Sequence, residues 1–375
     1  MNSVVTLLLL FLTYGYAQGQ GYQKHQSKLK HSAEIISIAA SDTQFATCSY
    51  DKSVMVWDYN GKVLYKYKLS DGKIHSLAFI TGSNLLLVGL TEIAKDKTPR
   101  HVIKCFDTTG KLNYELIDTL LTQESVNYLF EQNSTGVRNA ISVADRAFPL
   151  LNIKKELQIP QVSNGLSHIE LIQSIAVSPD NTTIASIDKF NILKIWDSNK
   201  KIQKSFKVTN TKKDTRIYFQ TNSSIFIEPN ILLNIADTTV QVIRGFEKYS
   251  SVPLNNLIYF YFNYFEESRP EQLFNRETGI SKVFDRETYY TIEATRSKDK
   301  FALLGVNGLI KIINEDGELL STFGQDRSEL ITLRGETINL LSTIKTIGMS
   351  PNGQYLISGD ESGKVIIWKT EQGTF

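Results

Sequence analysis

A repeated unit constrains the fold of this 375-residue chain more than any other feature of its sequence. Residues 31–58, 168–197 and 344–368 each begin with a short run of Ile and small residues, pass through a turn and end in a strand that closes on Trp. One such unit cannot bury its own apolar face, so internal repeats predict an array of stacked units with a shared core.

The local patterns are those of strands throughout. Runs rich in Ile, Val and aromatic residues, such as Ser53–Trp57, are bounded by turn residues, and no long helical period occurs. A second motif recurs at 57–62, 106–111 and 313–318. It consists of an apolar residue, Asp or Asn, two variable residues, Gly and a charged residue. It predicts a tight hairpin in which Gly takes the positive φ. Many short strands with regular turns indicate a sandwich, a barrel or a propeller.

The units resemble the WD40 repeat in three respects. A His stands ten positions before a Ser, a Ser-Pro-Asp or Ser-Pro-Asn turn follows the first strand, and a later strand ends in Trp or Trp-Asp. The resemblance covers residues 22–375 and implies an all-β β-propeller of four-stranded blades. Seven blades are predicted, with first strands centred near Ile36, Leu77, Tyr128, Ile175, Tyr218, Ile292 and Ile347.

Two regions of the propeller need separate predictions. Little chain remains after Trp368, and in the family the two termini overlap, so Tyr22–Lys30 is expected to be the outer strand of the last blade. Residues 253–288 hold an aromatic strand and a doubled Phe-x-Arg-Glu-Thr segment. We expect an insertion between two blades there; the alternative is a degenerate extra blade, which would make eight.

The first 17 residues are predicted to be a signal peptide. They carry no charged side chain, Val4–Leu12 is almost wholly apolar, and small residues precede Gln18 where a signal peptidase would cut. An uncleaved anchor, another targeting segment and a buried strand are the alternatives. A secretory or extracellular location follows from the first interpretation and a cytoplasmic one from the last. Asn-x-Ser/Thr sequons stand at Asn133, Asn181 and Asn222.

The resemblance implies a buried hydrogen-bond chain in the first unit. Trp57 would donate to Ser49, Ser49 would bond to His31, and His31 to Asp51. A Ser, a His and an Asp also suggest a hydrolase triad. The structural interpretation is favoured because the Trp partner and the Ser-x-Asp spacing belong to the repeat, and a triad Ser needs an exposed turn.

The other two units are expected to carry weaker versions of this chain. The second has His168, Ser186, Asp188 and Trp196, but two extra residues separate its Asp from its Trp. Its tetrad is therefore expected to be imperfect. The third has Asp360 and Ser362 where Ser and Asp should stand, with no His, so no tetrad is expected.

No catalytic, cofactor-binding or metal-binding residue is assigned. The five histidines, at positions 25, 31, 75, 101 and 168, show no metal-ligand spacing. No phosphate-binding Gly loop occurs. Cys48 and Cys105 both fall on predicted strands, so buried free thiols are favoured over a disulfide. With 41 Lys and Arg against 39 Asp and Glu, no nucleic acid partner is expected.

Two basic features allow a binding role. Residues 189–216 contain nine basic and two acidic residues, which indicates either a Lys-studded edge that blocks strand pairing or a patch for an acidic surface. Leu333-Arg334-Gly335 resembles part of the motif of phosphoinositide-binding propellers, which carry an Arg pair, but has one Arg.

These features favour a non-catalytic scaffold that binds protein partners and works within a larger complex. A propeller binding phosphoinositides or acidic surfaces is the alternative, and a channel-site enzyme is a weaker one. An enzyme would need convergent carboxylates, His or metal ligands near the axis, and the sequence assigns none there. Apolar inner strands without an acidic cluster would count against it.

Overall fold

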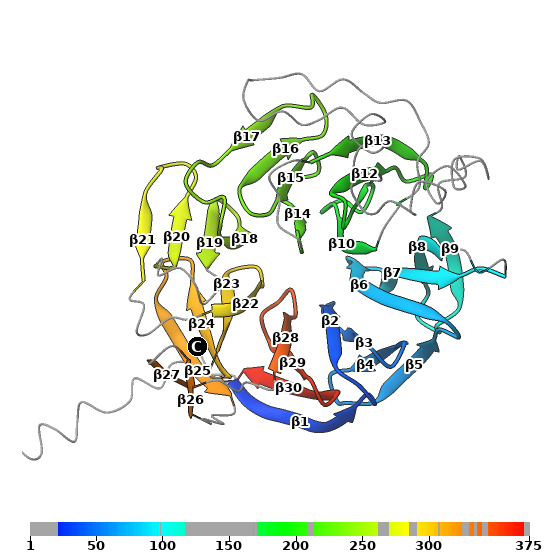
Figure 1. Cartoon of the computed structure of the whole chain (residues 1–375), viewed down its shortest axis with the longest axis horizontal. Helices are drawn as coiled ribbons and strands as arrows, with labels where there is room; N and C mark the ends of the chain where they lie inside the picture. Colours follow the sequence, from blue (N-terminus) through cyan, green and yellow to red (C-terminus); the bar gives the residue numbers. More distant parts are fainter. Residues whose placement is uncertain are drawn as a thin grey trace, which may run out of the picture.

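Seven four-stranded antiparallel sheets form a ring of blades around a central axis (Figure 1). The computed structural model describes residues 22–95, 97, 99–116, 168, 171–208, 214–261, 270–284, 291–306, 308–324, 330–333, 336–339 and 344–370. Within these ranges the chain consists of strands and turns and holds no helix. The all-β propeller with seven blades is therefore confirmed.

In blades one to six the strands follow each other in chain order from the axis outward. Blade one contains β2 (Ile35–Ala40), β3 (Gln44–Ser49), β4 (Ser53–Asp58) and β5 (Val63–Lys68). Blade two contains β6 (Gly72–Ile80), β7 (Leu85–Ile93), β8 (Pro99–Phe106) and β9 (Leu112–Leu116). Blade three contains β10 (Ile172–Val177), β11 (Ile184–Asp188), β12 (Ile192–Trp196) and β13 (Ile202–Lys207).

The next three blades repeat this order. Blade four contains β14 (Ile217–Phe219), β15 (Ser224–Ile227), β16 (Ile231–Asn234) and β17 (Val240–Val242). Blade five contains β18 (Ser250–Leu254), β19 (Leu257–Tyr261), β20 (Gln272–Asn275) and β21 (Ser281–Val283). Blade six contains β22 (Thr291–Arg296), β23 (Lys300–Gly305), β24 (Leu309–Asn314) and β25 (Leu319–Gly324), and a two-stranded hairpin of β26 (Leu330–Leu333) and β27 (Glu336–Asn339) follows it.

Blade seven takes strands from both ends of the chain. β28 (Ile344–Met349), β29 (Tyr355–Asp360) and β30 (Lys364–Thr370) are its inner three strands, and β1 (Tyr22–Lys30) is the outermost. β1 runs antiparallel to β30, with Tyr22 opposite Thr370 and Lys30 opposite Lys364. The predicted ring closure is confirmed, and Figure 1 shows the blue first strand beside the red last one.

The hydrophobic core lies between the blades. Seven apolar clusters fill the seven interfaces between neighbouring blades, and the cluster around Ile35, Trp57 and Ile367 joins blade seven to blade one. Each sheet thus buries both faces against its neighbours, which a four-stranded sheet cannot do alone.

The expected insertion at residues 253–288 is wrong. Most of this region belongs to blade five, whose strands β18 and β19 are almost entirely buried. The blade does not show the repeat pattern because its third strand, β20, holds no Trp. Aromatic packing stabilises it, with Phe246 stacked on Phe260 at 3.8 Å between ring centroids. The expected blade near Tyr128 lies outside the described residues, and blades two and three contact each other directly. Seven blades, and not eight, therefore form the ring.

The two faces of the ring carry different parts of the chain. We call one the connection face: the inner strands begin there, and it carries the links between blades and the turns between second and third strands. The hairpin face carries the turns between first and second and between third and fourth strands. β9 ends and β10 begins at the connection face.

Candidate functional site

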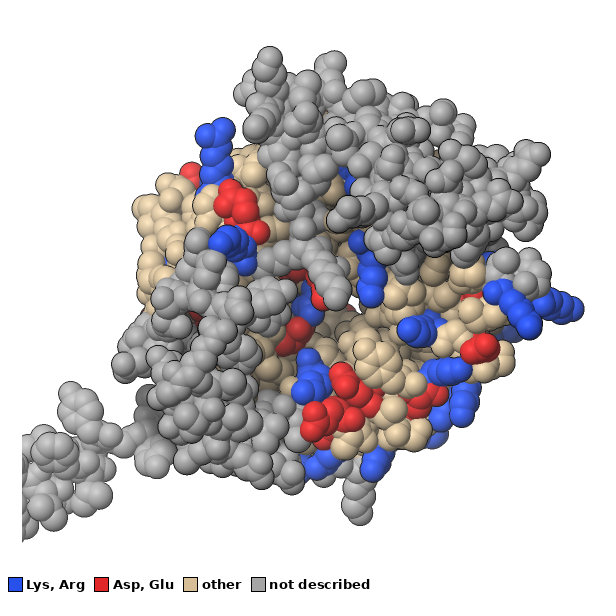
Figure 2. All heavy atoms as spheres, in the orientation of Figure 1, with Lys and Arg blue, Asp and Glu red and all other residues tan. Residues whose placement is uncertain are grey.

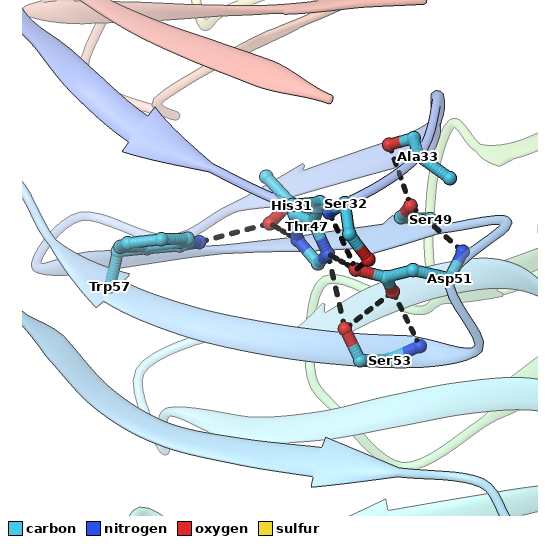
Figure 3. A network of polar contacts seen from close by, with 8 residues as sticks. All are labelled: His31, Ser32, Ala33, Thr47, Ser49, Asp51, Ser53 and Trp57. Atoms are coloured by element: carbon cyan, nitrogen blue, oxygen red, sulfur yellow. Dashed lines mark hydrogen bonds and ion pairs between the residues drawn. The ribbon is translucent and has the colours of Figure 1, made fainter. Parts of the chain in front are cut away.

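The first unit forms a buried polar network at the connection face of blade one (Figure 3). Trp57 Nε1 donates to Thr47 Oγ1 (2.9 Å), and His31 Nε2 lies 2.8 Å from the same oxygen. His31 Nδ1 lies 3.1 Å from Asp51 Oδ2 and 3.1 Å from Ser53 Oγ. The tetrad therefore exists, with Thr47 as its hydroxyl.

The prediction that Ser49 accepts from Trp57 is wrong, and strand register gives the reason. Phe45 on β3 is the cross-strand partner of Trp57, so the indole reaches the residue two positions further along the same face, which is Thr47. Ser49 lies one more step away. It donates to Ala33 O (2.8 Å) and accepts from Asp51 N (3.1 Å), so it fixes the turn and not the Trp.

Blade three has a complete tetrad, contrary to expectation. Trp196 Nε1 donates to Ser186 Oγ (2.9 Å), which lies 2.6 Å from His168 Nε2, and His168 Nδ1 lies 3.2 Å from Asp188 Oδ2. The hydroxyl stands ten residues before the Trp, as in blade one. The Asp stands two residues after the hydroxyl in blade three and four residues after it in blade one, so counting back two residues from the Asp finds Ser186 but not Thr47.

Blade seven has no complete tetrad, as expected, but it keeps the hydrogen bond from the Trp to a hydroxyl, which was not expected. Trp368 Nε1 donates to Ser358 Oγ (3.0 Å) at the same ten-residue spacing. Asp360 Oδ1 accepts from the backbone N–H groups of Ser362 (2.9 Å) and Lys364 (2.8 Å), which closes the turn between β29 and β30.

The electrostatics of the blade-one tetrad are those of a structural network. Burial lowers the pKa of His31, against the influence of Asp51, so the imidazole is neutral at pH 7. Burial would raise the pKa of Asp51, but hydrogen bonds from Ser53 and Ser32 and the nearby His31 outweigh it and lower that pKa to about 2. Thr47 is fully buried. A nucleophile must reach its substrate, and this hydroxyl does not.

Two histidines that are far apart in the sequence meet in blade two. His75 Nε2 lies 3.2 Å and His101 Nδ1 lies 2.8 Å from the hydroxyl of Thr91. Burial, followed by the nearby charges of His101, Lys189 and Lys73, lowers the pKa of His75 to about 4. No spacing rule would have found this pair, because β6 and β8 bring the two rings together from either side of β7.

Metal ligands and thiols were also considered. Within the described ranges, no three His, Cys, Asp or Glu side chains lie close enough to share a metal ion. Cys48 and Cys105 are buried free thiols, as predicted, and burial raises the pKa of Cys48 to about 12. A thiol with so high a pKa is a poor nucleophile at neutral pH.

The basic segment 189–216 does not form one surface. Lys194 is fully buried on β12, Lys204 and Lys207 donate to backbone carbonyl groups, and Arg216 pairs with Glu293. Its other described lysines lie on both faces: position 189 on the connection face, 200 and 201 on the hairpin face. On the face that Figure 2 shows, Lys and Arg are interspersed with Asp and Glu. The Arg of Leu333-Arg334-Gly335 lies outside the described residues.

The described inner strands carry a single acidic residue, Glu293 on β22. Its carboxylate forms a bidentate pair with Arg216, at 2.6 Å from Nη1 and 2.7 Å from Nη2. The pair spans from blade four to blade six across the fully buried inner strand of blade five. Arg216 therefore already occupies both carboxylate oxygens, and the described inner strands offer no second acidic side chain beside them.

The connection face of blade one presents an exposed aromatic side chain. Tyr50 is 63% exposed on the turn between β3 and β4. Its backbone N–H donates to Glu34 O (3.0 Å), and the next residue is the tetrad's Asp51. The ion pair of Lys52 with Asp71 (3.1 Å) lies on this face. Sequence analysis did not single out Tyr50; its place in the turn before the tetrad Asp is the signal that could have found it.

Fold and network together define a seven-bladed β-propeller with Trp-hydroxyl-His-Asp tetrads. The profile of the family described as WD domain, G-beta repeat matches residues 23–58 and 329–369, which include the tetrad strand of blade one and the closing strands of blade seven. The chain is a WD40-repeat propeller. No curated protein matched its sequence. Among the described residues no helix has the length and apolarity that crossing a membrane requires.

Proposed function

We propose that this propeller is a non-catalytic scaffold that binds a protein partner through the connection face of blade one. WD40 propellers generally serve as protein-interaction scaffolds and are typically not enzymes. The observation that carries the specific proposal is Tyr50, a large aromatic side chain exposed on a turn that the buried tetrad holds in place.

The turn is fixed before any partner arrives. Asp51 Oδ1 accepts from Ser53 N (2.9 Å), Lys52 N donates to Ser49 O (3.1 Å), and Lys52 has a φ of 65°. An aromatic anchor on a rigid turn loses little conformational entropy on binding, and Tyr is enriched among residues that dominate interface energy.

Charged side chains lie on the same face as this anchor. His31 N donates to Gly363 O (2.8 Å), which holds the turn 361–363 of blade seven against blade one. The ion pair of Lys345 with Glu361 (3.2 Å) therefore joins that of Lys52 with Asp71 on the same face. An apolar centre with a polar rim is the usual anatomy of a protein–protein interface.

Crosslinking and a matched pair of variants test the proposal. A photo-crosslinking amino acid at position 50 should capture the partner, and one at Ile280, 68% exposed on the hairpin face, should not. Once the partner is identified, Tyr50→Ala should weaken binding by about 30-fold, as expected for an interface hot spot, while Ile280→Ala should change it less than twofold. Equal capture at both positions, or an unchanged affinity for Tyr50→Ala, would contradict the proposal.

A further inference from the structure

Two arginines bridge the ends of the inner strands of blades four and five on the hairpin face. Arg276, which follows β20, donates from Nη2 to Asn255 O (2.7 Å) and lies 3.4 Å from Gln220 Oε1. Arg296, at the end of β22, donates to Pro253 O and lies 3.4 Å from Phe219 O. Both guanidinium groups thus span the same gap, from the end of β14 to the end of β18.

Neither arginine has a carboxylate partner among the described residues. The contacts of Arg296 are two carbonyl groups and the ring of Tyr218, 5.4 Å from its guanidinium carbon. Glu277, whose charge acts on Arg276 without forming an ion pair, accepts through Oε1 from Asn256 Nδ2 (2.5 Å), and Glu315 Oε1 accepts from Asn255 Nδ2 (2.5 Å). Two like charges in a half-buried gap repel each other unless an anion lies near both.

The gap also has more hydrogen-bond donors than acceptors. Two buried nitrogen atoms, Arg276 Nε and Gln220 Nε2, have no acceptor in the described structure. Gln220 Oε1 faces Arg276, so the amide nitrogen points away from that contact. A buried N–H without an acceptor costs about 1–3 kcal/mol, so such a group needs an explanation.

Burial lowers the pKa of Arg296 to about 10, which leaves the guanidinium charged at neutral pH. The side chains of Arg276, Arg296 and Gln220 are half-buried, and the neighbouring Asn255 and Asn256 are exposed. The side chains that carry the donors are therefore partly exposed on the hairpin face, with the two unsatisfied nitrogens buried just beneath it.

We propose that this gap binds an oxyanion, a phosphate or a carboxylate group, with Arg276, Gln220 and Arg296 as the donors. An oxyanion supplies the acceptors that the two unsatisfied nitrogens lack and the ion-paired negative charge that neither guanidinium group has among the described residues. The site lies on the face opposite Tyr50 and does not depend on the scaffold proposal.

Calorimetric titration of the full chain with inorganic phosphate and, separately, with acetate tests the site, with ionic strength held constant by chloride. We expect saturable binding of at least one anion, and the tighter of the two identifies the group. Arg276→Gln should weaken that binding about tenfold or more, because it removes a charge-assisted hydrogen bond. Arg100→Gln is the matched control: Arg100 is a half-exposed arginine on the connection face, 3.5 Å from Glu115, and its loss should leave binding unchanged.

Gln220→Glu keeps the proposal testable if an arginine variant does not fold. It places a carboxylate beside Arg276, so it should abolish anion binding and raise the melting temperature of the ligand-free protein. Absence of saturable binding to either anion by the wild-type chain would overturn the proposal and leave the arginines a purely structural clasp. Equal affinities in wild type, Arg276→Gln and Gln220→Glu would also overturn it.

Discussion

Replacing Thr47 by Val tests whether Thr47, and not Ser49, is the hydroxyl of the blade-one tetrad. Valine keeps the β-branched shape of threonine, so the substitution leaves no cavity in β3. It removes the oxygen that accepts from Trp57 Nε1 at 2.9 Å and lies 2.8 Å from His31 Nε2. Trp57 is 3% exposed and His31 2%, so water cannot replace the lost partner.

Two buried polar groups are left without a partner, and each such group costs about 1–3 kcal/mol. His31 keeps its contacts with Asp51 and Ser53 through Nδ1, so its share lies at the low end. We therefore expect Thr47→Val to lower the free energy of unfolding by about 3 kcal/mol. Ser49→Ala also loses two hydrogen bonds, so single-variant stabilities alone do not separate the two residues.

A double-mutant cycle with Trp57→Phe does separate them. Phe lacks the indole N–H, so Thr47→Val should cost less in its presence, with a coupling energy of about 1–2 kcal/mol. Ser49→Ala should show no coupling to Trp57→Phe. Urea denaturation followed by circular dichroism, with m-values checked for equality, gives the four free energies of each cycle. Coupling of Trp57 to Ser49 in place of Thr47 would refute the register argument.

Three further predictions concern other parts of the chain. Deleting residues 18–30 removes the outer strand of blade seven and should abolish the single cooperative calorimetric transition, whereas deleting 1–17 should leave the melting temperature unchanged; equal melting of both deletions would contradict ring closure by β1. Because the pKa of His75 is about 4 when folded and about 6.5 when unfolded, the unfolded chain binds the proton first, so stability should fall by about 1–2 kcal/mol from pH 7 to pH 5 and by less in His75→Gln. We also propose that the chain enters the secretory pathway, so N-terminal sequencing of the native protein should begin near Gln18; an intact Met1 in a cytosolic fraction would reverse this.

Local chemistry made much of the fold predictable. Blades one, three and seven can be recognised in the sequence because each has a strand that ends in Trp after a turn rich in Ser, Asp and Asn. The few residues after Trp368 predict that Tyr22–Lys30 is the outer strand of blade seven. These signals are local in sequence: the Trp and its hydroxyl stand ten residues apart in all three blades. The hydroxyl of blade one was predicted wrongly because it was counted from the Asp and not from the Trp, and the position of the Asp relative to the hydroxyl differs between blades one and three.

The remaining features depend on contacts between blades, which no local pattern encodes. Blade five lacks the Trp and fills its interfaces with aromatic rings on both faces of β19, so its strands do not alternate and resemble an insertion. The contact of Arg276 with Gln220 joins residues 56 positions apart, and that of Arg216 with Glu293 spans 77. Of these residues the sequence analysis singled out only Arg216, as part of the basic segment 189–216, and the fold decides which side chain it pairs with.

In blade one the tetrad that stabilises the fold lies beside the residue proposed to bind the partner, and two substitutions separate the effects on stability and on binding. Tyr50 is exposed and makes no buried side-chain contact that the tetrad needs, so Tyr50→Ala should reduce binding without lowering the melting temperature. Thr47→Val should instead lower stability first and binding only as a consequence. It weakens the network that holds Asp51, and through Asp51 the turn that presents Tyr50, so any loss of binding should scale with the loss of stability and diminish at low temperature where the chain stays folded. A partner that is insensitive to Tyr50→Ala but sensitive to Thr47→Val would need the blade intact and not this turn, which would move the binding surface elsewhere on the ring.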